Sequence, residues 1–166
     1  MAASAIRTGV SVALLALASA TAGCAYGIRG SLPAHLSTVR ITPFRSSVQE
    51  YGLEQELNSL FVEEMVSEGR LSIVTASPDA VIECIITGFF RTPYSYSSSE
   101  QIEEYKLEIR ASMSLTDFVA DEAILANEPV NEWIVYDPAR EEYSEAKRRL
   151  LVQTADEMAR MCISGW

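Results

Sequence analysis

The sequence has few of the residues, and none of the motifs, from which enzyme sites are commonly built. Its one histidine, His35, lies in a loop without a partner in view, which is typical of a surface residue. The chain has no GxSxG turn, no HExxH helix, no paired-cysteine metal motif and no dinucleotide-binding glycine pattern. The sequence therefore predicts a protein that is not an enzyme and that holds no metal and no cofactor.

Positive charge is also scarce. The chain has 13 Lys and Arg residues against 23 Asp and Glu residues, which gives a net charge of −10. A field of this sign repels DNA and anionic lipid at long range. The composition therefore argues against a nucleic-acid partner.

The one long hydrophobic run is too short to cross a membrane. It covers residues 10–22 and follows a single base, Arg7. A membrane-spanning helix needs about 20 apolar residues, whereas the apolar region of a secretory signal needs about 7–15. Residues 1–23 are therefore expected to be a signal peptide. Its removal would leave 143 residues with a net charge of −11, enough for one domain and too few for two.

The end of this run resembles a bacterial lipobox. In that motif the cysteine is acylated and becomes the new N-terminus, and here the motif reads Thr21-Ala22-Gly23-Cys24, with Thr21 in place of the usual Leu. We expect Cys24 to carry the lipid anchor. Ala25 stands where an Asp commonly signals inner-membrane retention, which favours the outer membrane. The alternative is a plain exported protein whose early cysteine is incidental.

Two cysteines remain after Cys24. Cys84 is expected on the apolar side of a strand and Cys162 on the apolar side of the last helix, so both would point into one core. An exported protein can hold a disulfide there. The two alternatives are a Cys84–Cys162 bridge and two buried free thiols, and the second is favoured because unpaired cysteine is commonly a small core residue.

Residue periodicity predicts a β-α-β-β-β-α order over residues 38–166, after a lead at 24–37. Residues 105–116 alternate strictly between apolar and polar side chains, which is typical of an antiparallel strand with one packed and one hydrated face. Two amphipathic helices can cover one face of such a sheet, so we expect a single α+β domain, a two-layer sandwich with a four-stranded, mainly antiparallel sheet. The expected elements are strands at 38–44, 79–91, 105–116 and 123–136, the last interrupted at Pro129, and helices at 49–68 and from Pro138 to about residue 163.

Local signals mark the ends of both helices. Ser47 and Glu50 resemble a capping box before the first helix, and Gly69 is placed to end it. Asp137 followed by Pro138 predicts the start of the second helix.

Three bases are expected on the polar side of the sheet. Arg91, Lys106 and Arg110 come near one another if residues 79–116 form a hairpin that turns near Ser98. One interpretation is an ordinary hydrated face, because acidic residues lie among the bases. The other is a local basic patch that binds phosphate groups at short range.

Several long strings resemble the LptE family of lipopolysaccharide-assembly lipoproteins. They are CAYGIRGSLPAHLSTVRITPF, YGLEQELNSLFVEEMVSEGRLSIV, DAVIECIITGFFRTPYSY and IEEYKLEIRASMSLTD, followed by a last helix that ends in Trp. The resemblance implies an outer-membrane lipoprotein that sits as a plug inside the β-barrel LptD and assists insertion of lipopolysaccharide into the outer leaflet. It also implies lipopolysaccharide binding by basic residues, for which Arg91, Lys106 and Arg110 are the candidates.

A different class of function is the alternative. The VRITPF strand and the YGLEQEL helix are also similar to small periplasmic regulatory lipoproteins, including activators of a cell-wall synthase. Such an activator must reach across the periplasm. About 14 residues separate Cys24 from the first strand, which is too short for that reach.

Overall fold

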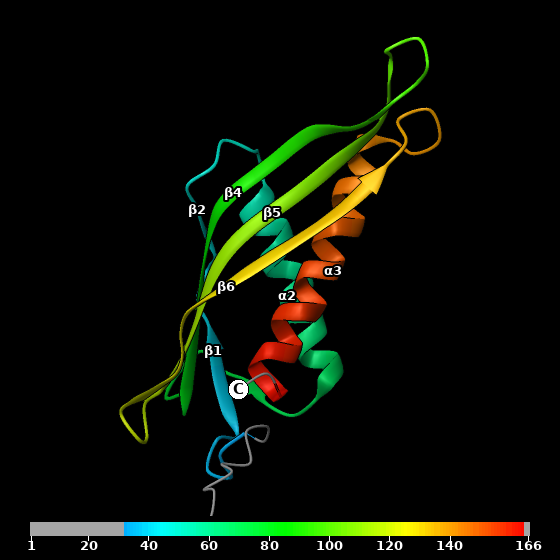
Figure 1. Ribbon diagram of the computed structural model, residues 1–166. Helices are drawn as coiled ribbons and strands as arrows, with labels where there is room; N and C mark the ends of the chain where they lie inside the picture. The colour runs from blue at the N-terminus through cyan, green and yellow to red at the C-terminus, as the bar shows by residue number, and fades with distance from the viewer. Residues whose placement is uncertain (1–31, 165–166) are drawn as a thin grey trace, which may run out of the picture.

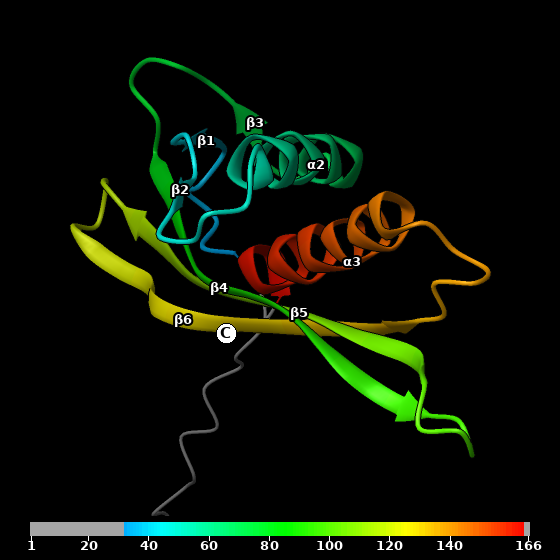
Figure 2. The same ribbon diagram turned by 90° about the horizontal axis from the view of Figure 1, so that it is seen from above.

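Two helices cover one face of a sheet in the computed structural model, which describes residues 32–164. Figures 1 and 2 show α2 and α3 side by side on that face. The expected two-layer α+β class is therefore confirmed. The elements are β1 (Thr38–Ile41), β2 (Arg45–Ser46), α2 (Leu53–Glu68), β3 (Ser72–Ile73), β4 (Ala80–Tyr96), β5 (Ile102–Asp117), β6 (Glu122–Tyr136) and α3 (Tyr143–Ser164).

The sheet has six strands, where the sequence predicts four. Their order is β3-β1-β4-β5-β6, and β2 also pairs with β4. Strand β1 runs parallel to β3 and β4 because α2 lies between them in sequence and supplies the crossover that parallel strands need. The expected first strand at 38–44 ends earlier, at Ile41, and β2 begins beyond its expected end, at Arg45. Strands β2 and β3 have two residues each, too few to produce a periodic pattern in the sequence.

Strands β4 and β5 form the long hairpin that the sequence predicts. The turn covers residues 97–101, where the Ser97 amide donates to the Gln101 carbonyl oxygen at 2.8 Å. Strand β4 continues to Tyr96 rather than ending near residue 91, because cross-strand pairing with β5 persists along the polar segment. In Figure 2 this hairpin extends away from the two helices.

A β-bulge at residue 87 changes which side chains of β4 face the helices. Ile86 pairs with Ala111, but Gly88 pairs with Arg110, so Thr87 is an extra residue. Beyond the bulge Phe89 packs against the core, and Phe90 is 43% exposed on the other face. The prediction that Phe90 shares a face with Ile86 is therefore wrong, because strict alternation cannot anticipate an inserted residue.

The core lies between the sheet and the two helices. The strict alternation predicted for β5 is confirmed, since its apolar side chains are buried and face the helices. The predicted apolar stripes of both helices are buried as well, apart from Leu60, which is partly buried. The buried residues from these three elements include Leu107, Ile109, Met113, Leu115, Leu53, Leu57, Phe61, Met65, Leu151, Ala155, Met158 and Cys162.

Both predicted helix starts are wrong. Helix α2 begins after Gly52, which has a left-handed conformation with φ 72° and provides no side-chain cap. Ser47 instead donates to the Ile86 carbonyl oxygen and continues the pairing of β2. Asp137 accepts a hydrogen bond from the Ala139 amide in a separate turn, and α3 starts six residues later.

The predicted end of α2 is confirmed. Gly69 follows the helix with φ 63°, and its amide donates to the Met65 carbonyl oxygen at 3.3 Å. This left-handed cap is the conformation that favours glycine.

Candidate functional site

Five side chains form a cluster on the sheet face opposite the helices. Glu108 is in its centre, with Phe90 directly across on β4 and Trp133 directly across on β6. Lys106 and Arg110 lie one position away on either side along β5, on the same face as Glu108. We call Phe90, Lys106, Glu108, Arg110 and Trp133 the outer-face cluster.

One carboxylate serves two cations in this cluster. Lys106 Nζ lies 2.7 Å from Glu108 Oε2, and Arg110 Nε donates to Glu108 Oε1 at 2.6 Å. Hydrogen bonds from Lys106 and then Arg110 lower the pKa of Glu108. The carboxylate is therefore ionised at neutral pH, and the three groups together carry one net positive charge on a protein whose total is −10.

Two exposed aromatic rings flank these charges. Lys106 Nζ lies 5.1 Å from the centroid of the Trp133 ring, and Arg110 Cζ lies 4.9 Å from that of Phe90. Trp133 is 51% exposed and Phe90 is 43% exposed. The Phe90 ring covers Gly88, since a Cβ atom there would lie 2.5 Å from Phe90 Cε2. The Phe90 ring can therefore lie over residue 88 only because that residue is a glycine.

Sequence reasoning missed both aromatic residues. Trp133 could have been found from the alternation of side chains along β6. Val130, Ile134 and Tyr136 occupy even-numbered positions and point to the core, so the odd-numbered residue 133 points away from it. Phe90 could not have been found in this way, because the bulge at residue 87 exchanges the faces to which the later even- and odd-numbered side chains of β4 point.

Arg91 lies on the other face of the sheet from Lys106 and Arg110. It pairs with Leu107 on β5, whose side chain faces the helices. Its guanidinium lies 3.8 Å from the ring centroid of Tyr105 and 5.5 Å from those of Tyr136 and Tyr143. The prediction that all three bases share the polar face is therefore wrong for Arg91, because the bulge shifts it, and the structure brings only Lys106 and Arg110 together.

Tyr143 links this group of tyrosines to the segment before α2. Its hydroxyl donates to Glu50 Oε1 at 3.1 Å, and Lys147 Nζ lies 3.6 Å from the same oxygen. Burial, followed by the nearby Glu50 charge, raises the pKa of Tyr143 to about 12. The surroundings of Arg91 thus connect β4, β5, β6 and the start of α3.

We expect Arg91→Ala to lower the free energy of unfolding by about 1 kcal/mol, because three aromatic contacts of the guanidinium are lost. The measurement is urea unfolding followed by circular dichroism. Arg148→Ala is the control, since it removes an exposed base from α3 and should change the midpoint less. Equal midpoints for Arg91→Ala and the unaltered protein would contradict a stabilising role for Arg91.

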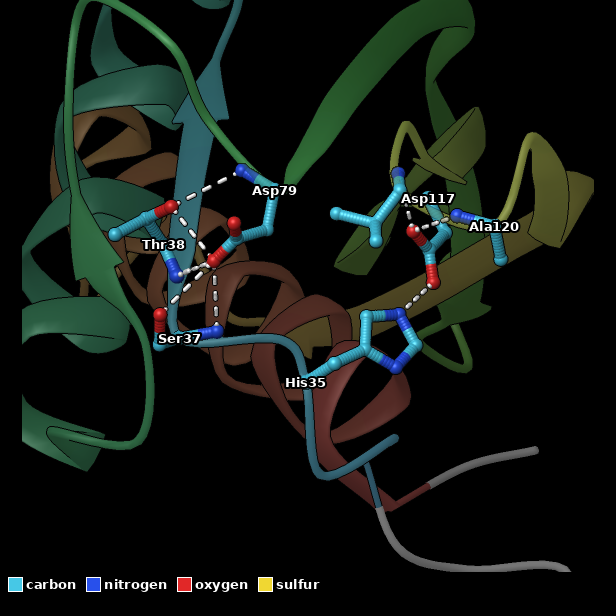
Figure 3. Close-up of polar contacts among 7 residues, drawn as sticks. His35, Ser37, Thr38, Asp79, Asp117 and Ala120 are labelled. Atoms are coloured by element: carbon cyan, nitrogen blue, oxygen red, sulfur yellow. Dashed lines mark hydrogen bonds and ion pairs between the residues drawn. The ribbon is translucent and has the colours of Figure 1, made fainter.

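His35 has a buried partner that the sequence did not reveal. Its Nε2 lies 2.5 Å from Oδ2 of Asp117, and Asp117 is only 2% exposed (Figure 3). The other oxygen of Asp117 accepts hydrogen bonds from the amides of Val119 and Ala120. The pair is 82 residues apart in sequence. It ties the segment before β1 to the turn between β5 and β6.

Asp79 makes a second tie at the same end of the molecule (Figure 3). Its Oδ2 accepts hydrogen bonds from the amide and hydroxyl of Ser37 and from the amide and hydroxyl of Thr38, at 2.8–3.0 Å. The Ser37 amide, followed by the Thr38 hydroxyl, holds the pKa of Asp79 well below its ordinary value of 3.8. The carboxylate thereby fixes the start of β1 against β4.

The lowered pKa of Asp79 predicts a loss of stability in acid. The unfolded chain protonates Asp79 at a higher pH than the folded chain does, so this stabilisation is present above about pH 4 and lost as the pH falls further. We expect Asp79→Asn to reduce the urea midpoint at pH 7 and to flatten its decline between pH 5 and about pH 3. Asp121→Asn, at the exposed β5–β6 turn, is the control and should retain the full decline. An unchanged pH profile in Asp79→Asn would refute this role.

The two late cysteines lie where the sequence places them, in the core. Both are buried, and Cys162 Sγ lies 3.8 Å from Met113 Sδ. Burial raises the pKa of each thiol to about 12. A bridge between Cys84 and Cys162 on oxidation stays a prediction. Cys24 lies outside the described residues, as do most of the expected signal and lead segments.

Within residues 32–164, neither helix is long and apolar enough to cross a membrane. No group of His, Cys, Asp and Glu in the same range is placed to hold a metal ion.

Comparison with known proteins identifies the family. The LptE family model, described as lipopolysaccharide-assembly, matches residues 36–163. No curated protein matches the chain. Among solved structures, lipoprotein B from Nitrosomonas europaea is 17% identical and covers 83% of this chain and 90% of its own, with a TM-score of 0.53. Rare lipoprotein B from Shewanella oneidensis is 19% identical and covers 74% and 92%, with a TM-score of 0.50.

A third similar structure, from Xanthomonas campestris, is 8% identical and covers 82% of this chain and 91% of its own, with a TM-score of 0.56. At these identities the structural likeness shows the fold alone. The family model is the stronger finding because it matches most of the sequence, and the expectation of a non-enzymatic protein agrees with it. This chain belongs to the LptE family of non-enzymatic lipopolysaccharide-assembly lipoproteins of the Gram-negative envelope.

Proposed function

We propose that this protein is an outer-membrane lipoprotein, acylated at Cys24, that partners the lipopolysaccharide-translocating β-barrel LptD. In this proposal it acts as a plug within the barrel and as an assembly factor for lipopolysaccharide insertion into the outer leaflet. The observation that carries the proposal is the family match over residues 36–163.

The dimensions of the sheet support a plug. Strand β4 has 17 residues and β5 has 16, whereas most strands in globular proteins have 3–10. At the rise of an extended chain, β4 is roughly 55 Å long, and the hydrocarbon core of a bilayer is about 30 Å thick. A sheet of this length is sufficient to traverse the lumen of a membrane barrel.

The polarity of the free sheet face also supports the proposal. Beyond the outer-face cluster, β5 presents Ser112, Ser114 and Thr116 on that face, and the Ser114 hydroxyl accepts a hydrogen bond from the Asn127 amide of β6. The interior wall of a membrane barrel is polar. We place this hydroxyl-bearing half of the face against the partner, and assign Lys106 and Arg110 to lipopolysaccharide. Arg91 has no part in this assignment, because it faces the helices.

Purification of the native protein from envelopes in mild detergent tests the partnership. We expect a large β-barrel protein to be recovered in comparable amounts. A Ser112→Arg, Ser114→Arg variant should lose it, because two added bases would crowd the contact face. Glu63→Arg, at an exposed position of α2, is the control and should retain it. Recovery of a cell-wall synthase in place of a barrel would favour the alternative function and overturn this one.

A further inference from the structure

We infer that the β5–β6 turn, residues 118–121, rests on the lipid bilayer to which the protein is anchored. In this contact Phe118 and Val119 are buried among the lipid headgroups and the upper acyl chains. The occupant of the surface is a membrane of zwitterionic lipid. The inference rests on the proposed function in one respect, because it uses the lipid anchor at Cys24.

Two large apolar side chains follow one another on this turn. Phe118 is 56% exposed and Val119 is 63% exposed. Turns ordinarily carry Gly, Pro, Asn, Asp and Ser, which suit tight bends and water. An aromatic and a branched aliphatic side chain at the end of a hairpin are stabilised when a partner removes them from water. The turn therefore carries an apolar surface that the rest of residues 32–164 leaves more than half uncovered.

Hydrogen bonds hold the turn in one conformation. Oδ1 of the buried Asp117 accepts hydrogen bonds from the amides of Val119 and Ala120 at 2.8 and 2.9 Å. The Phe118 amide donates to the Asp79 carbonyl oxygen at 2.8 Å. Three successive backbone amides are thus satisfied within the protein. Because the turn is already ordered, contact with a surface costs it little conformational entropy.

The same carboxylate joins the turn to the segment that leads to the anchor. Asp117 Oδ2 contacts His35 Nε2, and His35 precedes β1 (Figure 3). His35 is 11 residues after Cys24, so the chain between them reaches at most about 40 Å when fully extended. The turn is therefore held at the anchored end of the molecule.

The length of the sheet excludes the inverted orientation. Strand β4 starts beside this turn, since Ala80 pairs with Asp117, and its 17 residues are roughly 55 Å long. With the far end of β4 nearest to the bilayer, His35 would lie farther from the membrane than the chain from Cys24 can reach. The end that carries Phe118 and Val119 therefore faces the bilayer.

The charge of the protein indicates which lipid the turn contacts. Asp121 and Glu122 are exposed beside the apolar pair, and the chain carries −10 in total. Anionic headgroups repel such a surface, so apolar burial against zwitterionic lipid must supply the contact. Two side chains are too few to hold the protein on a membrane by themselves. The anchor supplies the high local concentration, and the turn then fixes how the sheet is oriented.

A tryptophan placed in the turn tests the contact. Phe118→Trp is measured in the acylated protein, reconstituted in phosphatidylcholine vesicles with and without bromine on the acyl chains, because bromine quenches nearby indoles. We subtract the emission of the unaltered protein, which has two tryptophans of its own. The added emission should fall about twofold in the brominated vesicles, since indole rings settle at the membrane interface.

Tyr51→Trp is the matched control for Phe118→Trp. Tyr51 is 99% exposed and precedes α2, whose other end leads to β3 beside the start of β1. The 16 residues of α2 place Tyr51 roughly 24 Å along the helix from the anchored end. Its added emission should therefore be the same in both kinds of vesicle.

A second preparation makes the test independent of acylation in cells. In the chain that starts at Cys24, the Cys24 thiol is coupled to a lipid with a maleimide headgroup, and Cys84 and Cys162 do not compete because they are buried. Equal quenching of Phe118→Trp and Tyr51→Trp in this preparation would overturn the inference. Val119→Trp gives the same measurement if circular dichroism shows that Phe118→Trp does not fold.

Barrel recovery separates this inference from the proposed function. A variant with both Phe118→Ser and Val119→Ser should still recover the barrel from envelopes. If this variant loses the barrel and Phe118→Trp is not quenched, the turn is a protein contact, which overturns the inference and leaves the proposed function standing. Quenching of Phe118→Trp in a protein that never recovers a barrel would support the inference and sink the proposed partnership.

Discussion

Replacement of Phe61 by alanine is expected to lower the free energy of unfolding by about 3–5 kcal/mol. The Phe61 side chain is fully buried on the sheet side of α2, and its ring centroid lies 5.5 Å from that of Phe44. The substitution leaves a cavity between the helix layer and the sheet that neighbours on rigid strands cannot fill. Because a domain of this size is stable by about 5–15 kcal/mol, a large part of the total would be lost. Urea unfolding measures the change.

Val66→Ala is the matched control for Phe61→Ala. Val66 lies on the same helix but is 64% exposed, so truncation of its side chain should change the free energy of unfolding by less than about 0.5 kcal/mol. A similar effect for the two variants would mean that the buried face of α2 does not stabilise the fold.

Cys24→Ala is expected to abolish membrane attachment of the protein in the absence of its partner. Each buried methylene of an acyl chain contributes about 0.8 kcal/mol, so the chains of a lipoprotein make attachment effectively permanent, and their loss removes it altogether. The measurement is fractionation of envelopes from cells that lack the barrel. Attachment of the unacylated protein to the outer membrane under these conditions would contradict the role of Cys24.

Two neighbouring variants serve as controls for Cys24→Ala. Thr21→Leu restores the usual residue of the lipobox and should leave attachment unchanged. Ala25→Asp introduces the residue that commonly signals inner-membrane retention, so the protein should move to the inner membrane. If Ala25→Asp remains in the outer membrane, sorting does not follow from this position.

Strand β5 and the two helices could be predicted because their patterns are local. The alternation of residues 105–116 requires only that one face of a strand be buried, and the stripe of α2 follows from helical spacing alone. The resemblance to the LptE family could also be stated from the sequence, because it depends on the order and length of strings. The family match over residues 36–163 confirms it.

The site was harder to predict because it depends on strand register. A single extra residue, Thr87, sends Arg91 to the helix face and Phe90 to the outer face. Its neighbour Gly88 leaves room for the Phe90 ring, and no pattern in the sequence of β4 predicts this contact. Likewise, His35 seemed to lack a partner in sequence because Asp117 is 82 residues away.

The sequence by itself determined the class of fold, the inward faces of β5, α2 and α3, and membership of the family, because periodicity and length are properties of the chain. Only the tertiary structure decided which charges meet. Lys106 and Arg110 share Glu108 between two aromatic rings, and Arg91 lies among tyrosines, because pairing across three strands and one bulge sets the position of each side chain. These contacts join segments that are distant along the chain, and no local pattern encodes their register.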